Sequence, residues 1–206
     1  MSSILKVDNL QTGAGATHSI SSLGVTSPGT VLQEICGVCD GRTVSGVTFQ
    51  NVTAYQDLTT SHTDITGSAI SYTPPAGTTT VVYTFAFHHR SIDHGGISHF
   101  QFIIDGTNVA SELGRRTMAG QHGSNAHYVA HHVLTFPILI DSSLSSDDIS
   151  NLKLKSWTSA KTLKMSAREY NSSYDARLHH NNWWDGAGAT APSSFVVPTL
   201  SIKAIA

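Results

Sequence analysis

The sequence predicts an all-β protein: an antiparallel β-sandwich of the jelly-roll type with an extended N-terminal arm. Short runs of Val, Ile, Thr, Tyr and Phe recur along the chain and are broken by Gly, Pro, Asn and Asp. No long stretch has apolar residues at the 3.6-residue period of a helix. The expected strands number about eight to ten, at spacings that are typical of a sandwich and not of βαβ units.

The strands are expected from their alternating pattern of apolar residues. In chain order they are Thr43–Asn51, Ala69–Thr73, Thr79–His89, Ser98–Ile104, Thr107–Leu113, Ala126–Ile140, Asn151–Trp157, Thr162–Tyr170 and Ser194–Ala206. The clearest is Thr79–His89, because its apolar residues on one face are large: Val81, Tyr83, Phe85 and Phe87. Asp105-Gly106 predicts a two-residue hairpin turn, since both positions tolerate positive φ. Pro137 predicts a bend in the longest strand.

The later strands have equally clear inward faces. Leu152 and Leu154 are in phase with each other, and so are Leu200 and Ile202 in the last strand. In the strand Thr162–Tyr170, one face carries Leu163, Met165 and Ala167.

The first 28 residues differ from the rest of the chain. Ile4, Val7 and Leu10 fit a short strand, but residues 11–29 are rich in Gly, Ser and Thr and have no core pattern. We therefore predict an arm over residues 1–28 and a jelly-roll domain over residues 29–206. Such an arm is typical of a component of a larger assembly, where it orders on a neighbour.

Composition limits the classes of function. The chain has 206 residues, 13% of them charged, and a net charge of -2. This balance gives no sign of a nucleic-acid or anionic-membrane partner. No run approaches the roughly 20 apolar residues of a membrane span. Residues 1–15 lack the apolar core of a signal peptide. We expect a soluble protein that is made in a cytoplasm, with no membrane insertion.

Cys36 and Cys39 are the only cysteines and form a CxxC pair. Such a pair can be a redox centre, a disulfide or half of a zinc site. No thioredoxin-like βαβ pattern surrounds it, and no further ligands lie nearby in the sequence. Reduced thiols at a strand or turn are the favoured interpretation, and a disulfide and a metal site are the alternatives.

Histidine is unusually frequent, with 12 residues. They fall into two clusters, one pair and two single residues: His88, His89, His94 and His99; His122, His127, His131 and His132; His179 and His180; His18 and His62. On a strand, His127 and His131 would lie about 13 Å apart, which is too far to share one ion without ligands from another strand or subunit. Half-buried sheet residues and interface hydrogen bonds are the favoured interpretation, with a metal or anion on a symmetry axis as the alternative. If they line a subunit interface, the oligomer should weaken below about pH 6.

No catalytic constellation is evident. Asp93, Asp105, Asp141 and the pair Asp147-Asp148 fit turns, where Asp bonds to its own backbone. The sequence has no GxSxG motif, no phosphate-binding loop and no glycosidase-like pair of carboxylates. No catalytic, cofactor-binding or metal residue is assigned, and no cofactor is expected. Trp183 and Trp184 precede a Gly-rich loop, where they would pack in the core or a subunit contact, or alternatively stack on a sugar.

Several segments resemble virion proteins of marine bacteriophages. These are MSSILKVDNLQ at the start, GSAISYTPPAG with TTTVVYTFAFHHR and ISHFQFIIDG, WTSAKTLKMSAREY, and LHHNNWWDGAGA with VVPTLSIKAIA at the end. The chain is therefore similar to tail-fibre-like virion surface proteins over residues 1–11 and 28–206. The histidine content and the two cysteines depart from that pattern.

The resemblance implies a trimeric β-sandwich head like those of tumour necrosis factor and the complement globular head. We expect a non-enzymatic tail-fibre or receptor-binding component located in the virion. Its partners would be two further copies of itself, other virion proteins and a host surface glycan or protein. The alternatives are a capsid decoration or head-fibre protein and, from a different class, a glycan depolymerase.

Overall fold

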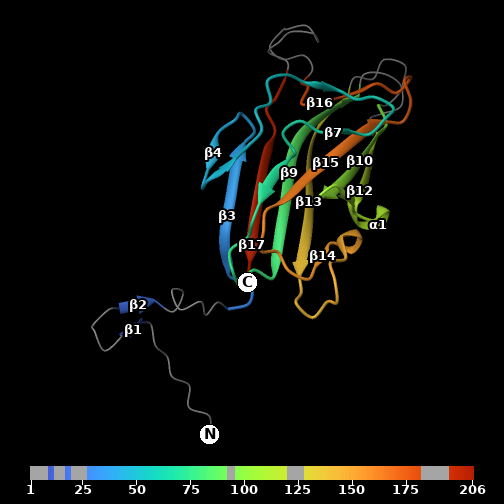
Figure 1. Ribbon diagram of the computed structural model, residues 1–206. Helices are drawn as coiled ribbons and strands as arrows, with labels where there is room; N and C mark the ends of the chain where they lie inside the picture. The colour runs from blue at the N-terminus through green and yellow to red at the C-terminus, as the bar shows by residue number, and fades with distance from the viewer. Residues whose placement is uncertain (1–8, 12–16, 20–26, 92–95, 120–127, 182–194) are drawn as a thin grey trace.

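The computed structural model describes residues 9–11, 17–19, 27–91, 96–119, 128–181 and 195–206. Over these residues the protein is an all-β sandwich of two sheets packed face to face (Figure 1). None of the helices in this part of the chain has the length and apolarity that a membrane span requires.

The first sheet is built around its longest strands, β9 and β13. Its seven strands are β3 (Val31–Val38), β6 (Gln56–Asp57), β9 (Thr80–Ser91), β13 (Tyr128–Ile140), β14 (Lys153–Leu154), β16 (Ala176–Leu178) and β17 (Thr199–Ile205). Strand β9 pairs with β13 on one side and with β17 and then β16 on the other. The pairing is antiparallel except for the short β13–β14 contact, which is parallel.

The second sheet has β10 and β15 at its centre. Its six strands are β7 (Thr63–Asp64), β8 (Ile70–Tyr72), β10 (Ser98–Ile104), β11 (Thr107–Asn108), β12 (Arg115–Met118) and β15 (Lys161–Glu169). Strand β10 is flanked by β15 on one side and by β11 and β12 on the other. Strands β12, β10 and β15 are therefore neighbours in this order, and their outward side chains can form one surface.

The remaining elements are short. Two small hairpins pair β1 (Asn9–Gln11) with β2 (Thr17–Ser19), and β4 (Thr43–Val44) with β5 (Val47–Thr48). A four-residue helix α1 (Ser111–Gly114) and a 3₁₀ turn η2 (Ile149–Asn151) are the helical elements of the described residues.

The core lies between the two sheets and is rich in aromatic rings. Strand β9 contributes the four large side chains that the sequence predicts on one face, and all four are buried. The Phe102 ring from β10 stacks on Phe136 from β13 with 4.3 Å between centroids. Tyr83 lies 4.9 Å from Phe102 and donates a hydrogen bond to the Ser68 carbonyl oxygen (2.7 Å). The predicted inward faces of the strands near residues 163–167 and 200–202 are also buried.

Three predicted strands differ from what the structure contains. Residues 107–113 form the two-residue strand β11 and then helix α1. Residues 151–157 contain only the two-residue strand β14, because Leu152 adopts a left-handed φ of 57° and ends η2. Residues 43–51 fold into the hairpin β4–β5. Each of these segments turns too soon for a long strand.

The predicted bend at Pro137 does not interrupt the pairing of β13 with β9. Pro137 lies in register opposite Val82, and β13 continues to Ile140 without a break in pairing. Strand β14 pairs with β13 only from Leu139 onwards, so at Pro137 the strand has a partner on one side only. A proline is tolerated there, since its missing N–H breaks no second ladder.

The start of the sandwich contains a strand that the sequence analysis does not predict. Strand β3 pairs with β17, and Gly29 donates a hydrogen bond to the Ala206 carbonyl oxygen (2.7 Å) just before it begins. Of the predicted arm, residues 1–8, 12–16 and 20–26 lie outside the described residues.

Candidate functional site

The outer face of the second sheet carries two rows of polar side chains. The register pairs His99 on β10 with Thr117 on β12 and Arg168 on β15. It also pairs Gln101 with Arg115 and Ser166. Residues two apart on a strand share a face, so all six side chains lie on the side away from the phenylalanines of the core.

A hollow of about 320 Å³ lies over these rows. Its lining includes both arginines, His99, Gln101 and Thr117 from the strands, together with His62 from the segment before β7. The volume is near the lower end of the roughly 300–1,000 Å³ that is typical of small-molecule sites. The hollow therefore has room for one small chemical group or one sugar ring.

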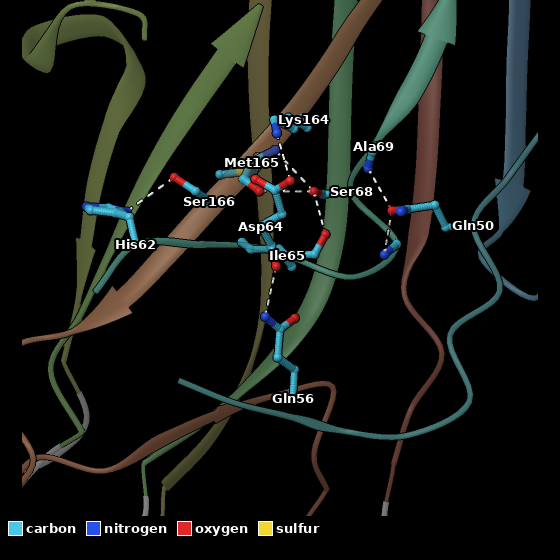
Figure 2. A network of polar contacts seen from close by, with 11 residues as sticks. Gln50, Gln56, His62, Asp64, Ile65, Ser68, Ala69, Lys164, Met165 and Ser166 are labelled. Atoms are coloured by element: carbon cyan, nitrogen blue, oxygen red, sulfur yellow. Dashed lines mark hydrogen bonds and ion pairs between the residues drawn. The ribbon is translucent and has the colours of Figure 1, made fainter. Parts of the chain in front are cut away.

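His62 is held in place by the segment that leads into β7. Its Nδ1 is hydrogen-bonded to Ser166 Oγ on β15 at 3.2 Å, as Figure 2 shows. Two residues further on, Asp64 forms a 2.7 Å ion pair with Lys164 on the same strand. Gln56 donates a hydrogen bond from Nε2 to the Asp64 carbonyl oxygen (2.9 Å).

The other end of this segment is fixed by a buried serine. Ser68 Oγ donates to the Ile65 carbonyl oxygen (2.7 Å) and accepts from the Met165 N–H (3.1 Å) (Figure 2). Next to it, Gly67 adopts a φ of +85°, and an added Cβ would lie 2.8 Å from side-chain atoms of Val52 and Pro198. Glycine is required here by both its conformation and the close approach. The segment that carries His62 is thus tied to β15 at both ends.

The arginines of the hollow have no carboxylate partner among the described residues. The six ion pairs among the described residues are formed by other side chains: Arg42, Lys161, Lys164, Arg177 and Lys203. Arg168 Nη1 donates to the carbonyl oxygens of Glu169 (3.1 Å) and Tyr170 (3.4 Å). Arg116, which also lines the hollow, lies over the Phe136 ring at 5.2 Å and donates to the Leu113 carbonyl oxygen. The positive charge of Arg115 and Arg168 is therefore available to a ligand.

The two histidines of the hollow both have a lowered pKa. Burial lowers the pKa of His62, and the charges of Arg168 and Arg115 lower it further. The same causes, in the same order, lower the pKa of His99. The Nδ1 of His99 is hydrogen-bonded to Thr117 Oγ1 (3.2 Å), and its Nε2 is buried without a partner in the described part of the chain.

An aromatic ring stands at the edge of this site. The Tyr170 side chain is 52% exposed, and its ring centroid lies 6.2 Å from that of His99. Tyr174 packs edge-on against Tyr170 at 5.6 Å. Exposed aromatic faces are suited to stacking on the apolar face of a sugar.

The arrangement fits the binding of an anion. Arginine, neutral histidine, glutamine and threonine side chains supply N–H and O–H donors, and guanidinium groups form strong hydrogen bonds with carboxylate and phosphate-like oxygens. No carboxylate lines the hollow within the described residues, so the site as described lacks the pair of acids that glycoside hydrolysis requires.

A larger hollow of about 500 Å³ lies elsewhere, lined by Pro74, Pro75, Lys155 and Trp157, among others. The Trp157 ring is buried and its Nε1 donates to the Tyr72 carbonyl oxygen (3.0 Å). Its indole N–H is therefore engaged within the fold. With one charged residue in its lining, this hollow offers less specific chemistry than the smaller one.

The cysteines are free thiols, so the disulfide alternative is wrong. Cys36 is exposed, whereas Cys39 is buried and its Sγ donates to the Gly67 carbonyl oxygen (3.2 Å). Burial raises the pKa of Cys39 to about 12, which keeps it protonated and unsuited to redox or metal chemistry.

The histidine clusters form cross-strand pairs that the sequence analysis does not predict. On the outer face of the first sheet, the rings of His88 and His131 lie 5.3 Å apart. On its inner face, the rings of His89 and His132 lie 5.8 Å apart. No group of three or more potential metal ligands comes together within the described residues.

Some of the histidines are too deeply buried to titrate near pH 6. Burial lowers the pKa of His89 to about 3 and that of His179 to about 4. His89 Nε2 is hydrogen-bonded to Ser98 Oγ (2.8 Å), and His179 Nε2 to the Thr66 carbonyl oxygen (2.9 Å). For these two residues, the expectation of charging near pH 6 is wrong.

Other predicted residues are at turns or outside the described residues. Asp105 has a φ of 47° in the predicted hairpin turn, and Asp141 accepts a hydrogen bond from the Ser143 N–H (2.9 Å). The outcome for several residues is open, because they lie outside the described part of the chain: His94, His122, His127, Asp93, Trp183 and Trp184.

His62 and His99 stand out in the sequence only as two of the 12 histidines, and no sequence pattern connects them with Arg115 and Arg168. Polar residues that alternate with apolar ones could have indicated the outer face of each strand. Which strands are neighbours, and in what register, is not contained in that pattern.

No protein-family model matches the chain, and no curated protein matches it. Two of the solved structures that are similar to the chain have low TM-scores. The EclA C-terminal domain, a sugar-binding protein, is 11% identical with a TM-score of 0.34, over 62% of this chain and 74% of that one. CBM35 from Paenibacillus barcinonensis is 13% identical with a TM-score of 0.23, over 74% of this chain and 91% of that one. Similarity at this level says nothing about the function of this chain.

Proposed function

We propose that the chain is a non-catalytic recognition component of a bacteriophage particle, of the tail-fibre or receptor-binding type. Its N-terminal arm attaches to other virion proteins, and its β-sandwich head contacts a glycan or protein on the host surface. The observation that supports recognition is the cationic hollow of His62, His99, Arg115 and Arg168, whose arginines have no carboxylate partner among the described residues.

A depolymerase is less well supported by the same geometry. Glycoside hydrolysis uses two carboxyl groups that face one groove, about 5–9.5 Å apart. Four hollows within the described residues, the two discussed above among them, have no carboxylate in their linings. A site that has hydrogen-bond donors but no carboxyl groups favours the binding of a saccharide over its hydrolysis.

A homotrimer is supported by the outer face of the other sheet. Between Thr80 and His88 on β9, and between Val133 and Leu139 on β13, the outward side chains carry no charge. Val133 is 56% exposed and Leu139 is 39% exposed. An uncharged strip with exposed apolar residues is suited to a subunit contact and leaves the cationic hollow, on the opposite sheet, free.

The test is binding of the fluorescently labelled full chain to whole cells of a panel of marine bacteria. The double variant Arg115→Gln/Arg168→Gln removes two of the three arginine charges that line the hollow. The matched control is Arg42→Gln, an exposed arginine that lines neither the hollow nor the uncharged strip of β9 and β13. We expect binding to cells of at least one strain that is lost in the double variant and kept in the control. Absence of binding across the panel, or equal binding by the double variant, would contradict the proposal.

A further inference from the structure

The hollow on the outer face of the second sheet has three arginines and no carboxylate in its lining within the described residues. Arg115 and Arg168 approach it from β12 and β15, on either side of β10. The nearest carboxylate in the register, Asp64 opposite Ser166 on β7, is already paired with Lys164 at 2.7 Å. Two arginines with no counter-charge favour the binding of a small oxyanion.

One histidine of the hollow has a ring nitrogen without a partner in the described residues. If Thr117 donates to Nδ1 of His99, the proton of the neutral ring is on Nε2. That nitrogen is buried and has no acceptor in the described residues, and a buried donor without a partner is unfavourable. This nitrogen is closed off from solvent, so an anionic oxygen in the hollow would reach it only if the side chains around the ring move.

The surroundings favour a sugar over a nucleic acid as the carrier of the anion. A nucleic-acid strand presents a phosphate at every nucleotide and is held by an extended basic surface. Here the basic groups form a single hollow of about 320 Å³ on a chain of net charge -2. The exposed Tyr170 ring beside His99 offers a stacking surface, and Gln101 and Thr117 offer partners for hydroxyl groups.

We infer that the hollow binds the anionic group of an acidic saccharide, either a sugar carboxylate or a sulfate ester, and that His99 or His62 takes up a proton as the anion binds. This inference rests on the proposed recognition function and names its ligand class. The charges that act on both imidazoles are those of Arg115 from β12 and Arg168 from β15. His99 also acts on His62, and the Tyr170 ring lies 6.2 Å from that of His99.

The sign of the pH dependence follows from these charges. In the free protein, burial and the two arginines lower the pKa of both histidines. A bound anion beside them opposes the effect of the arginines and raises the pKa of each ring. The bound state therefore holds more protons than the free state, so affinity rises as the pH falls through the window between the two pKa values.

The test is calorimetric titration of the full chain with four probes: a galacturonic acid tetramer, a sulfated galactose tetramer, an uncharged galactose tetramer and sodium sulfate. We expect one acidic tetramer to bind at least tenfold more tightly than the uncharged one, and the comparison of the two acidic tetramers identifies the carboxylate or the sulfate ester. Arg168→Gln and Arg115→Gln should each weaken that binding about tenfold or more, and the control Arg42→Gln should change it less than twofold.

The proton uptake is tested by repeating the titration from pH 8 to pH 5.5 at constant ionic strength. Affinity should rise up to about tenfold per pH unit for each proton taken up, and His99→Gln or His62→Gln should reduce this rise. Equal affinity for the acidic and uncharged tetramers, no effect of Arg168→Gln, or a flat pH profile would each overturn the inference. If no probe binds while labelled chain still binds bacterial cells through the arginines, the inference fails and the proposed function stands. If the cells are not bound either, both fail.

Discussion

His89 and His99 lie on opposite sides of strand β10, and their surroundings differ in kind. His89 reaches β10 from the core side, where it is hydrogen-bonded to Ser98 and packs against Phe100 with 6.1 Å between ring centroids. His99 belongs to β10 itself and faces outward between Thr117 and Arg168. The inner ring is almost fully buried, whereas the outer ring shares a hollow with three arginines.

Both rings have a lowered pKa, but the second cause differs, so we expect protonation of the two rings to be coupled to different processes. Burial is the largest cause of the lowered pKa of both rings, but the second cause is His132 for His89 and Arg168 for His99. Burial in the core is relieved only by unfolding, so protonation of His89 is coupled to folding. The field of an arginine is offset by a bound anion, so protonation of His99 is coupled to binding.

The largest effect is expected from the core side of β10. Phe102→Ala removes a fully buried ring that stacks on Phe136, and it should lower the free energy of unfolding by about 3–5 kcal/mol. Urea unfolding followed by tryptophan fluorescence measures the change. The control is His99→Gln on the outer face of the same strand, which should cost less than about 1 kcal/mol. Equal losses in the two variants would contradict the division of β10 into a structural and a functional face.

The next effect is acid destabilisation through the inner histidines. Because the folded-state pKa of His89 is about 3 and that of His179 about 4, against 6.5 for an unperturbed ring, the unfolded chain binds more protons below pH 6.5. The stability that they contribute is fully present above pH 6.5 and is lost as the pH falls towards these values. The loss is at most about 1.4 kcal/mol per pH unit for each ring.

Unfolding free energies between pH 7.5 and pH 5 measure this loss. His89→Gln keeps a hydrogen-bonding side chain near Ser98 but does not titrate, so its stability should fall less steeply with acid than that of the unchanged chain. An identical slope in the two proteins would show that His89 does not carry the effect.

A smaller effect is expected at the segment that carries His62. Ser68→Ala removes a buried hydroxyl that bonds to Ile65 and Met165, and it should lower the free energy of unfolding by about 1–3 kcal/mol. Since this serine ties the segment to β15, affinity for the acidic saccharide should fall as well. Thermal unfolding and saccharide titration of the same variant measure both quantities, and unchanged affinity would mean that the anchor does not position His62.

The smallest effect is expected from the ion pair beside the hollow. Asp64 is 61% exposed, so Asp64→Asn should change the free energy of unfolding by less than about 1 kcal/mol. The variant frees the charge of Lys164 and should raise affinity for the acidic saccharide by about twofold at low salt. If Asp64→Asn greatly lowered the stability and did not raise the affinity, the charged residues on the outer face of the second sheet would have a structural role and not a role in binding the saccharide.

Much of the inner face could be predicted from the sequence. Strand β10 begins and ends where the alternation of Phe100, Phe102 and Ile104 predicts, and β9 buries the expected residues. A core face repeats every second residue and is large and apolar, so it is visible within one strand. An exception is the segment 151–157, where Leu152 has a left-handed φ, so the expected long strand is reduced to the two residues of β14.

The outer face could not be predicted in the same way. Arg115 and Arg168 are 53 positions apart in the sequence, and only the pairing of both strands with β10 brings them to one hollow. The pairing of His88 with His131 has the same origin. Strand neighbours and register are set by the whole sheet, and no motif within a single strand records them.

The central claim is that the outer face of β10 couples protons to anion binding, while the inner face couples them to folding. The most direct measurement is calorimetric titration of the acidic saccharide near pH 6 in two buffers of different ionisation enthalpy, which counts the protons taken up per anion bound. The account predicts proton uptake by the unchanged chain, the same uptake in His89→Gln, and a reduced uptake in His99→Gln. Binding without proton uptake, or an uptake that is lost in His89→Gln and kept in His99→Gln, would contradict it.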